Sequence, residues 1–129
     1  MEAKDYFNNG YSCSESIIKW AIDEGLCPQE LLPCATPFSG GMSSGCLCGA
    51  IAGSQIVLGY IFGRNNKNNN PEISRQYAKE LIERFKELNG ATCCKVLTRN
   101  IEPQNRKQHC TKMVNDCAEI IKSMLKVNV

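Results

Sequence analysis

Apolar side chains recur at helical spacing through most of this 129-residue chain, and this periodicity limits the fold more than any other feature. The clearest segment runs from Pro71 to about Leu88, where apolar residues fall three or four positions apart. Similar segments run from Cys110 to Val127 and, mostly apolar, from Cys48 to Phe62. No segment has the alternating pattern of a half-buried strand. The sequence therefore predicts an all-α fold, a compact bundle of about six helices in one domain over residues 1–129.

Local start and stop signals refine this prediction. Ser12 or Ser14 can cap a helix that ends at Gly25, because serine accepts hydrogen bonds at a helix start and glycine ends helices easily. Thr92 is expected to cap a further short helix. The polar segment 102–109 is expected to be a connection that precedes the last helix.

Charge and hydropathy exclude several classes of protein. The chain has 15 basic and 13 acidic side chains, a net charge of +2, which gives no argument for binding nucleic acid or an anionic membrane surface. The longest apolar stretch, Ala50 to Phe62, is shorter than the roughly 20 apolar residues that a membrane-spanning helix needs. The N-terminal segment is polar and has no export signal. We therefore expect a cytoplasmic protein.

The chain has nine cysteines, an odd number, and the expected compartment keeps thiols reduced. A cysteine cluster in that setting indicates metal binding or redox chemistry more often than structural disulfides. No C-x-x-C pair is present, which excludes a thioredoxin-type redox pair. Because His109 is the only histidine, a zinc site of two cysteines and two histidines is excluded as well.

Helical spacing separates the cysteines into two groups. Cys117 lies on the apolar stripe of the last helix and is expected to be a small buried residue. Cys27 and Cys34 lie in a proline-rich segment and are expected to be structural or incidental. Only one of the neighbours Cys93 and Cys94 should face a shared site, because adjacent helical residues diverge by about 100°. Four candidates remain: Cys13, Cys48, Cys94 (or Cys93) and Cys110.

Each of the four candidates lies at or near the start of a predicted helix. Cys48 falls in the first turn of its helix, where free N–H groups and the helix dipole are expected to stabilise a thiolate. Convergence of the four helix starts would form an electropositive pocket lined with thiolates. Such a pocket suits an iron–sulfur cluster, whose thiolate-ligated core is negatively charged.

Glycine recurs every four residues around Cys48, at Gly41, Gly45, Gly49 and Gly53. Inside a helix each glycine costs about 1 kcal/mol relative to alanine, so Gly49 and Gly53 need a compensating interaction. Two explanations stay open. Either another helix packs closely against this face, or a cofactor approaches the backbone there.

At these residues the sequence resembles a known family of small proteins assigned a redox role, the C-GCAxxG-C-C family. The resemblance covers nearly the whole chain and is carried by Gly10-Tyr11-Ser12-Cys13, Phe38-Ser39-Gly40-Gly41, Cys48-Gly49-Ala50-Ile51-Ala52-Gly53, Gly90 with Cys94 and Leu97, and Cys110 with Val114. Ser39 stands where the family has a glycine. The resemblance implies a helical fold and an electron-transfer or thiol-redox role. A similar domain in split-Soret cytochromes has an iron–sulfur centre associated with cysteines of this kind.

The resemblance makes Cys13, Cys48, Cys94 and Cys110 the shared signature set, and three hypotheses follow. The first is an electron carrier with a [2Fe–2S] cluster on these four thiolates, serving a redox partner protein that the sequence does not identify. The second is a metal-free thiol–disulfide protein or sensor in which Cys48 is the catalytic, attacking thiol. The third is a zinc site with four cysteine ligands. Cys46 or Cys93 could substitute as a ligand or act as a resolving thiol, and the glycine-rich helix could also support a homodimer.

Overall fold

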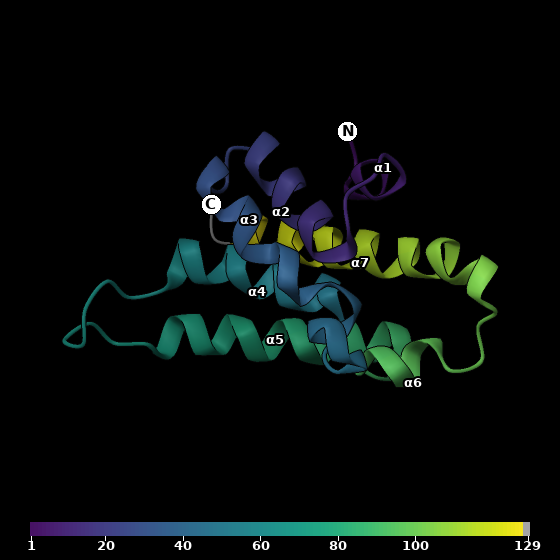
Figure 1. Cartoon of the computed structure of the whole chain (residues 1–129). Helices are drawn as coiled ribbons and strands as arrows, with labels where there is room; N and C mark the ends of the chain where they lie inside the picture. The colour runs from purple at the N-terminus through teal and green to yellow at the C-terminus, as the bar shows by residue number, and fades with distance from the viewer. Residues whose placement is uncertain (128–129) are drawn as a thin grey trace.

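Seven α-helices form most of residues 1–127, the part of the chain that the computed structural model describes (Figure 1). They are α1 Ala3–Asn8, α2 Cys13–Asp23, α3 Leu32–Ala35, α4 Gly49–Phe62, α5 Glu72–Asn89, α6 Cys94–Thr98 and α7 Arg106–Val127. Within these residues there is no strand, only an isolated antiparallel bridge between Leu47 and Cys93. The all-α prediction is confirmed.

The apolar helix α4 lies at the centre of the bundle. It contacts α2, α5 and α7, and Figure 1 shows α4 and α5 running side by side from the long polar loop that joins them. Helix α7 contacts α1, α2, α4 and α5 and so closes the core. Most of α4 is buried because almost every residue along it is apolar or small, with Ile51, Val57 and Leu58 at most 1% exposed.

Close packing of α2 on α4 depends on Gly53. A Cβ atom at this position would lie 2.6 Å from the backbone oxygen of Ser14 in α2, nearer than any side chain tolerates. The explanation of Gly53 by tight helix packing is therefore confirmed, and the contact offsets the low helix propensity of glycine. The hydroxyl of Ser14 donates to the backbone oxygen of Ala35 over 2.7 Å, so this buried polar group is satisfied.

The start of α2 is fixed by the capping residue that the sequence predicted. Ser12 is the N-cap, its hydroxyl accepts a hydrogen bond from the backbone N–H of Glu15 over 3.3 Å, and the Glu15 carboxylate accepts one from the backbone N–H of Ser12 over 3.0 Å. This reciprocal arrangement is a capping box. It makes Cys13 the first residue of α2.

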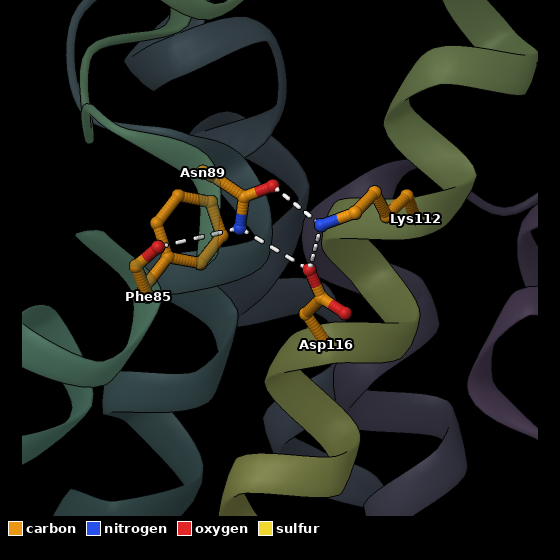
Figure 2. Close-up of polar contacts among 4 residues, drawn as sticks. All are labelled: Phe85, Asn89, Lys112 and Asp116. Carbon is orange, nitrogen blue, oxygen red and sulfur yellow. Dashed lines mark hydrogen bonds and ion pairs between the residues drawn. The ribbon is translucent and has the colours of Figure 1, made fainter. Parts of the chain in front are cut away.

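A polar cluster joins the end of α5 to the middle of α7 (Figure 2). The Asn89 side chain donates to the backbone oxygen of Phe85 over 3.3 Å and to Asp116 Oδ2 over 3.2 Å. Lys112 Nζ donates to Asn89 Oδ1 over 3.0 Å and to Asp116 Oδ2 over 2.7 Å. These contacts hold α5 against α7. Asp116 directly precedes Cys117, which is fully buried in the core.

Two predicted helix starts differ from the structure. Helix α7 begins at Arg106 and not at Cys110, because a 3₁₀ turn at Pro103–Asn105 leads directly into it and the fixed φ of proline suits the first turn of a helix. Helix α6 has Cys93 as its N-cap, in place of the predicted Thr92. Among the described residues, every helix is too short or too polar to span a membrane.

Candidate functional site

The four cysteines of the signature line one pocket of about 760 Å³. Cys13 is the first residue of α2, Cys48 is the N-cap of α4, and Cys94 is the first residue of α6. Cys110 is one turn inside α7, because that helix starts earlier than the sequence predicted. Residues nearly a hundred positions apart in the chain therefore line one pocket.

Gly49 lets the thiol of Cys13 reach the start of α4. A Cβ atom at position 49 would overlap Cys13 Sγ and would lie 3.0 Å from the backbone oxygen of Phe38. Gly49 itself lines the pocket, whereas Gly53 is one turn further along α4 and packs on α2 outside the pocket lining. The two glycines of the motif thus have different tasks: Gly49 makes room for a thiol and Gly53 makes room for a helix.

A left-handed turn at Gly41–Gly45 forms another wall of the pocket. Met42 and Ser43 have φ values of 64° and 58°, which cost roughly 1–2 kcal/mol per residue for non-glycine side chains. The turn is held by a hydrogen bond from the backbone N–H of Cys46 to the Gly41 oxygen over 2.7 Å. A Cβ atom at Gly41 would lie 2.6 Å from Cys94 Cβ, so glycine is needed for this wall to approach α6.

Backbone hydrogen bonds join the segment before α4 to the start of α6. The backbone N–H of Cys94 donates to the Cys46 oxygen over 2.5 Å, and that of Cys48 donates to the Thr92 oxygen over 2.8 Å. Cys93 Sγ bonds the backbone oxygen of Gly45 over 3.2 Å, outside the pocket lining, so Cys94 is the member of the adjacent pair at the pocket. The prediction that only one of these two thiols faces the site is confirmed.

The remaining cysteines lie away from the pocket lining. Cys117 is fully buried in the core, as predicted, and Cys27 is also buried. Cys34 and Cys46 are exposed, so Cys46 lies in the loop beside the site without lining it. All nine thiols are free.

Burial controls the chemistry of Cys48. Removal from water raises the pKa of this thiol to about 12, against the opposing effect of the N–H groups of Ile51 and Ala50 in the first turn of α4. Cys48 is only 7% exposed. The expectation of a depressed pKa at Cys48 is therefore wrong, because desolvation outweighs the helix start.

The other pocket thiols influence one another. Burial, then the neighbouring Cys13 and Cys94, raise the pKa of Cys110 to about 11, and burial with Cys13 raises that of Cys94. Arg106 acts in the opposite direction and lowers the pKa of both. The thiols are thus close enough to make ionisation of one harder once another carries charge.

Three cations line the pocket, and sequence reasoning missed them: Lys95, Arg106 and Lys107. Among the described lining residues there is no carboxylate. Lys107 Nζ lies 5.1 Å from the centre of the Phe7 ring, a cation–π contact at the pocket wall. Had the last helix been extended to residue 106, helical spacing would have put Arg106 and Lys107 on the same face as Cys110.

The thiols surround the pocket without gathering at one point. In residues 1–127 no three side chains of cysteine, histidine, aspartate or glutamate are grouped closely enough to hold a single metal ion. His109, the only histidine, bonds the backbone oxygen of Leu97 through Nε2 over 2.8 Å. Among the described lining residues, the thiols are therefore the metal ligands available, with no imidazole or carboxylate beside them.

Most of the chain matches a known protein family. The family described as "Putative redox-active protein (C_GCAxxG_C_C)" matches residues 11–124, which include all four pocket cysteines and the glycine motif after Cys48. No curated protein and no solved structure is significantly similar to this chain. The match over most of the chain makes it a member of the C_GCAxxG_C_C family.

Proposed function

We propose that this protein is an electron carrier that holds an iron–sulfur cluster, in its simplest form [2Fe–2S], on Cys13, Cys48, Cys94 and Cys110. One observation carries the proposal: four thiols from four separate segments line a single pocket that has no carboxylate among its described lining residues. Iron–sulfur clusters are held by four cysteine thiolates. The description of the family supports a redox role without naming a cofactor.

The surroundings of the four thiols suit a negatively charged cluster. Arg106 lies near enough to Cys94 and Cys110 to favour their thiolate forms, and Lys95 and Lys107 add positive charge at the pocket. Gly49 lets Cys13 Sγ lie against the start of α4, in the space that a larger residue would occupy. When bound, the cluster would supply one-electron chemistry. The chain itself would supply the ligands, the compensating charge and a partly dry pocket.

The spread of the thiols favours a cluster over the zinc alternative. Four thiolates on one zinc ion have bonds of about 2.3 Å, so their sulfurs must gather closely around a single point. A cluster divides its four ligands between two or more irons and accepts thiolates that are further apart. In the described residues no three such donors are grouped closely enough for one ion.

Metal-free thiol–disulfide exchange has weaker support. The attacking species in such a reaction is the thiolate, and the pKa of about 12 leaves Cys48 almost entirely protonated at neutral pH. Metal binding avoids this difficulty, because the positive charge of the metal removes the proton from a coordinating thiol.

Adjacent cysteines offer a matched pair of variants for the test. Cys94→Ser removes a proposed ligand, whereas Cys93→Ser makes the same chemical change one residue earlier, outside the pocket lining. Both variants and the unaltered protein would be purified without air and analysed for iron, acid-labile sulfide and visible absorption. We expect Cys94→Ser to lose or destabilise the cluster and Cys93→Ser to retain it.

Two results would contradict the proposal. One is equal loss of iron from both variants, which would mean that iron binding does not depend on the pocket-lining thiol of Cys94. The other is zinc in place of iron and sulfide in all three proteins, which would favour the zinc site. In either case far-UV circular dichroism would verify that the variants are folded.

A further inference from the structure

Positive charge is concentrated in the part of the chain that forms the pocket mouth. Residues 1–63 contain two basic and six acidic side chains, so the first half of the chain is acidic. Residues 93–112 contain five basic side chains and a single acidic one, Glu102. The near-neutral net charge of the whole chain therefore conceals a strongly basic segment, residues 93–112.

Four of these basic residues lie at or beside the pocket. Lys95, Arg106 and Lys107 line it, and Arg99 is exposed one turn after Lys95, at the C-cap of α6. Within residues 1–127 none of the four forms an ion pair. Their charges are therefore directed to solvent, where they create a positive potential at the pocket opening.

Two exposed apolar side chains lie next in sequence to residues that line the pocket. Met42, in the left-handed turn, is 43% exposed, and Val96, in α6, is 42% exposed. The neighbours of both residues line the pocket: Ser43 beside Met42, and Lys95 and Leu97 beside Val96. We call the set formed by Met42, Lys95, Val96, Arg99, Arg106 and Lys107 the basic mouth.

We propose that the basic mouth docks an acidic protein that exchanges electrons with the pocket, an inference that rests on the proposed function. Apolar contacts with a polar and charged rim are the usual anatomy of a protein interface. Complementary charge steers such partners together and orients them. The described lining residues include no carboxylate, so the pocket lining itself carries no negative side chain that would repel an acidic surface.

The test is a titration that needs no bound metal. The reduced, metal-free full chain, labelled with ¹⁵N, would be titrated with flavodoxin, an acidic one-electron carrier protein, at low and at high salt. We expect amide shift changes in the Gly41–Gly45 turn, in α6 and at the start of α7, and weaker binding at high salt as ions screen the charges.

A pair of arginine substitutions makes the titration specific. Arg99→Glu reverses a charge of the basic mouth without altering a pocket-lining residue, and Arg75→Glu makes the same change on α5, at another exposed arginine. We expect Arg99→Glu to weaken flavodoxin binding about three- to tenfold and Arg75→Glu to leave it within about twofold. Val96→Ser should also weaken binding, but without a change in its salt dependence.

Several results would overturn the inference. These are shift changes on another face, no binding at low salt, or equal effects of Arg99→Glu and Arg75→Glu. Binding of a heparin fragment at the same residues without binding of flavodoxin would also overturn it, since the surface would then be a general polyanion site. Because no metal takes part, a failure here is separate from a failure of the iron and sulfide analysis.

Discussion

The thiol of Cys13 occupies the space that a side chain at position 49 would need. This contact connects the first cysteine of the signature with the glycine that follows the second. It explains why the start of α2 can lie beside the start of α4, and it brings two of the four thiols to the same wall of the pocket. The first prediction follows from it.

Replacing Gly49 by alanine should displace Cys13 Sγ and impair metal retention. Alanine has the higher helix propensity, by about 1 kcal/mol, so the local helix alone would gain from the change. The overlap with a thiol and with the Phe38 backbone should reverse that gain. Iron content after anaerobic purification and the midpoint of urea unfolding would measure the two effects.

Gly59→Ala is the control within the same helix. A Cβ atom at Gly59 meets nothing within 4 Å, so the substitution should stabilise the protein by about 0.5–1 kcal/mol and leave iron content unchanged. Equal behaviour of the two alanine variants would show that the Cys13–Gly49 contact has no role in the site.

The thiols of the metal-free protein should differ widely in their reactivity. The pKa of about 12 predicts that Cys48 is alkylated slowly by iodoacetamide at pH 7 and gains reactivity up to pH values well above 10. Exposed Cys34 should react fastest and serve as the internal reference. Peptide mass spectrometry would follow each site, and rapid alkylation of Cys48 at neutral pH would restore the attacking-thiol hypothesis.

Stability should fall at both ends of the pH range because of the Tyr6–Asp23 hydrogen bond. The bond from Tyr6 lowers the pKa of Asp23, so its stabilising effect is present above the unfolded-state value of about 3.9 and is lost as pH falls through the folded value. Hydrogen bonding to Asp23 and burial raise the pKa of Tyr6 to about 12. The contribution of Tyr6 to stability is therefore complete below its unfolded-state value of about 10 and is lost as pH rises towards 12.

The variant Tyr6→Phe isolates this hydrogen bond. Its urea midpoint should be lower than that of the unaltered protein near pH 7, and the difference should shrink both below about pH 4 and above about pH 10. A difference that stays constant from acid to alkaline pH would show that only the packing of the ring contributes.

The polar cluster between α5 and α7 should contribute measurably to stability (Figure 2). Asn89→Ala removes an amide that bonds Phe85, Lys112 and Asp116, so we expect a loss of about 1–2 kcal/mol in the free energy of unfolding. Asn100→Ala, at an exposed position, should change it by less than about 0.5 kcal/mol. Losses of similar size in both variants would contradict the role given to the cluster.

The helices could be predicted because their signals are local. Ser12 followed by Glu15 specifies a capping box, Gly90 ends α5 in a left-handed conformation, and apolar spacing marks the long helices. Spacing alone left Cys94 or Cys93 open, and the family resemblance selected Cys94. Cys110 was selected for a helix start that the structure places one turn earlier, at Arg106.

The electrostatics of the site could not be predicted, because they depend on tertiary packing. The sequence puts Cys48 at a helix start, which lowers a thiol pKa, but only the folded chain shows the burial that raises it. Arg106 was missed because a polar segment was interpreted as a connection, whereas Pro103 starts a turn that continues into α7. The left-handed conformation of Met42 has no local sequence signal, because residues other than glycine rarely adopt a positive φ.

Analysis of iron and acid-labile sulfide in protein that has never met air is the most direct test of the central claim. The account predicts iron and sulfide in equal amounts, at least two of each per chain, together with visible absorption that bleaches on reduction. Colourless protein without iron or sulfide, even after reconstitution, and with the pocket thiols still free would contradict it.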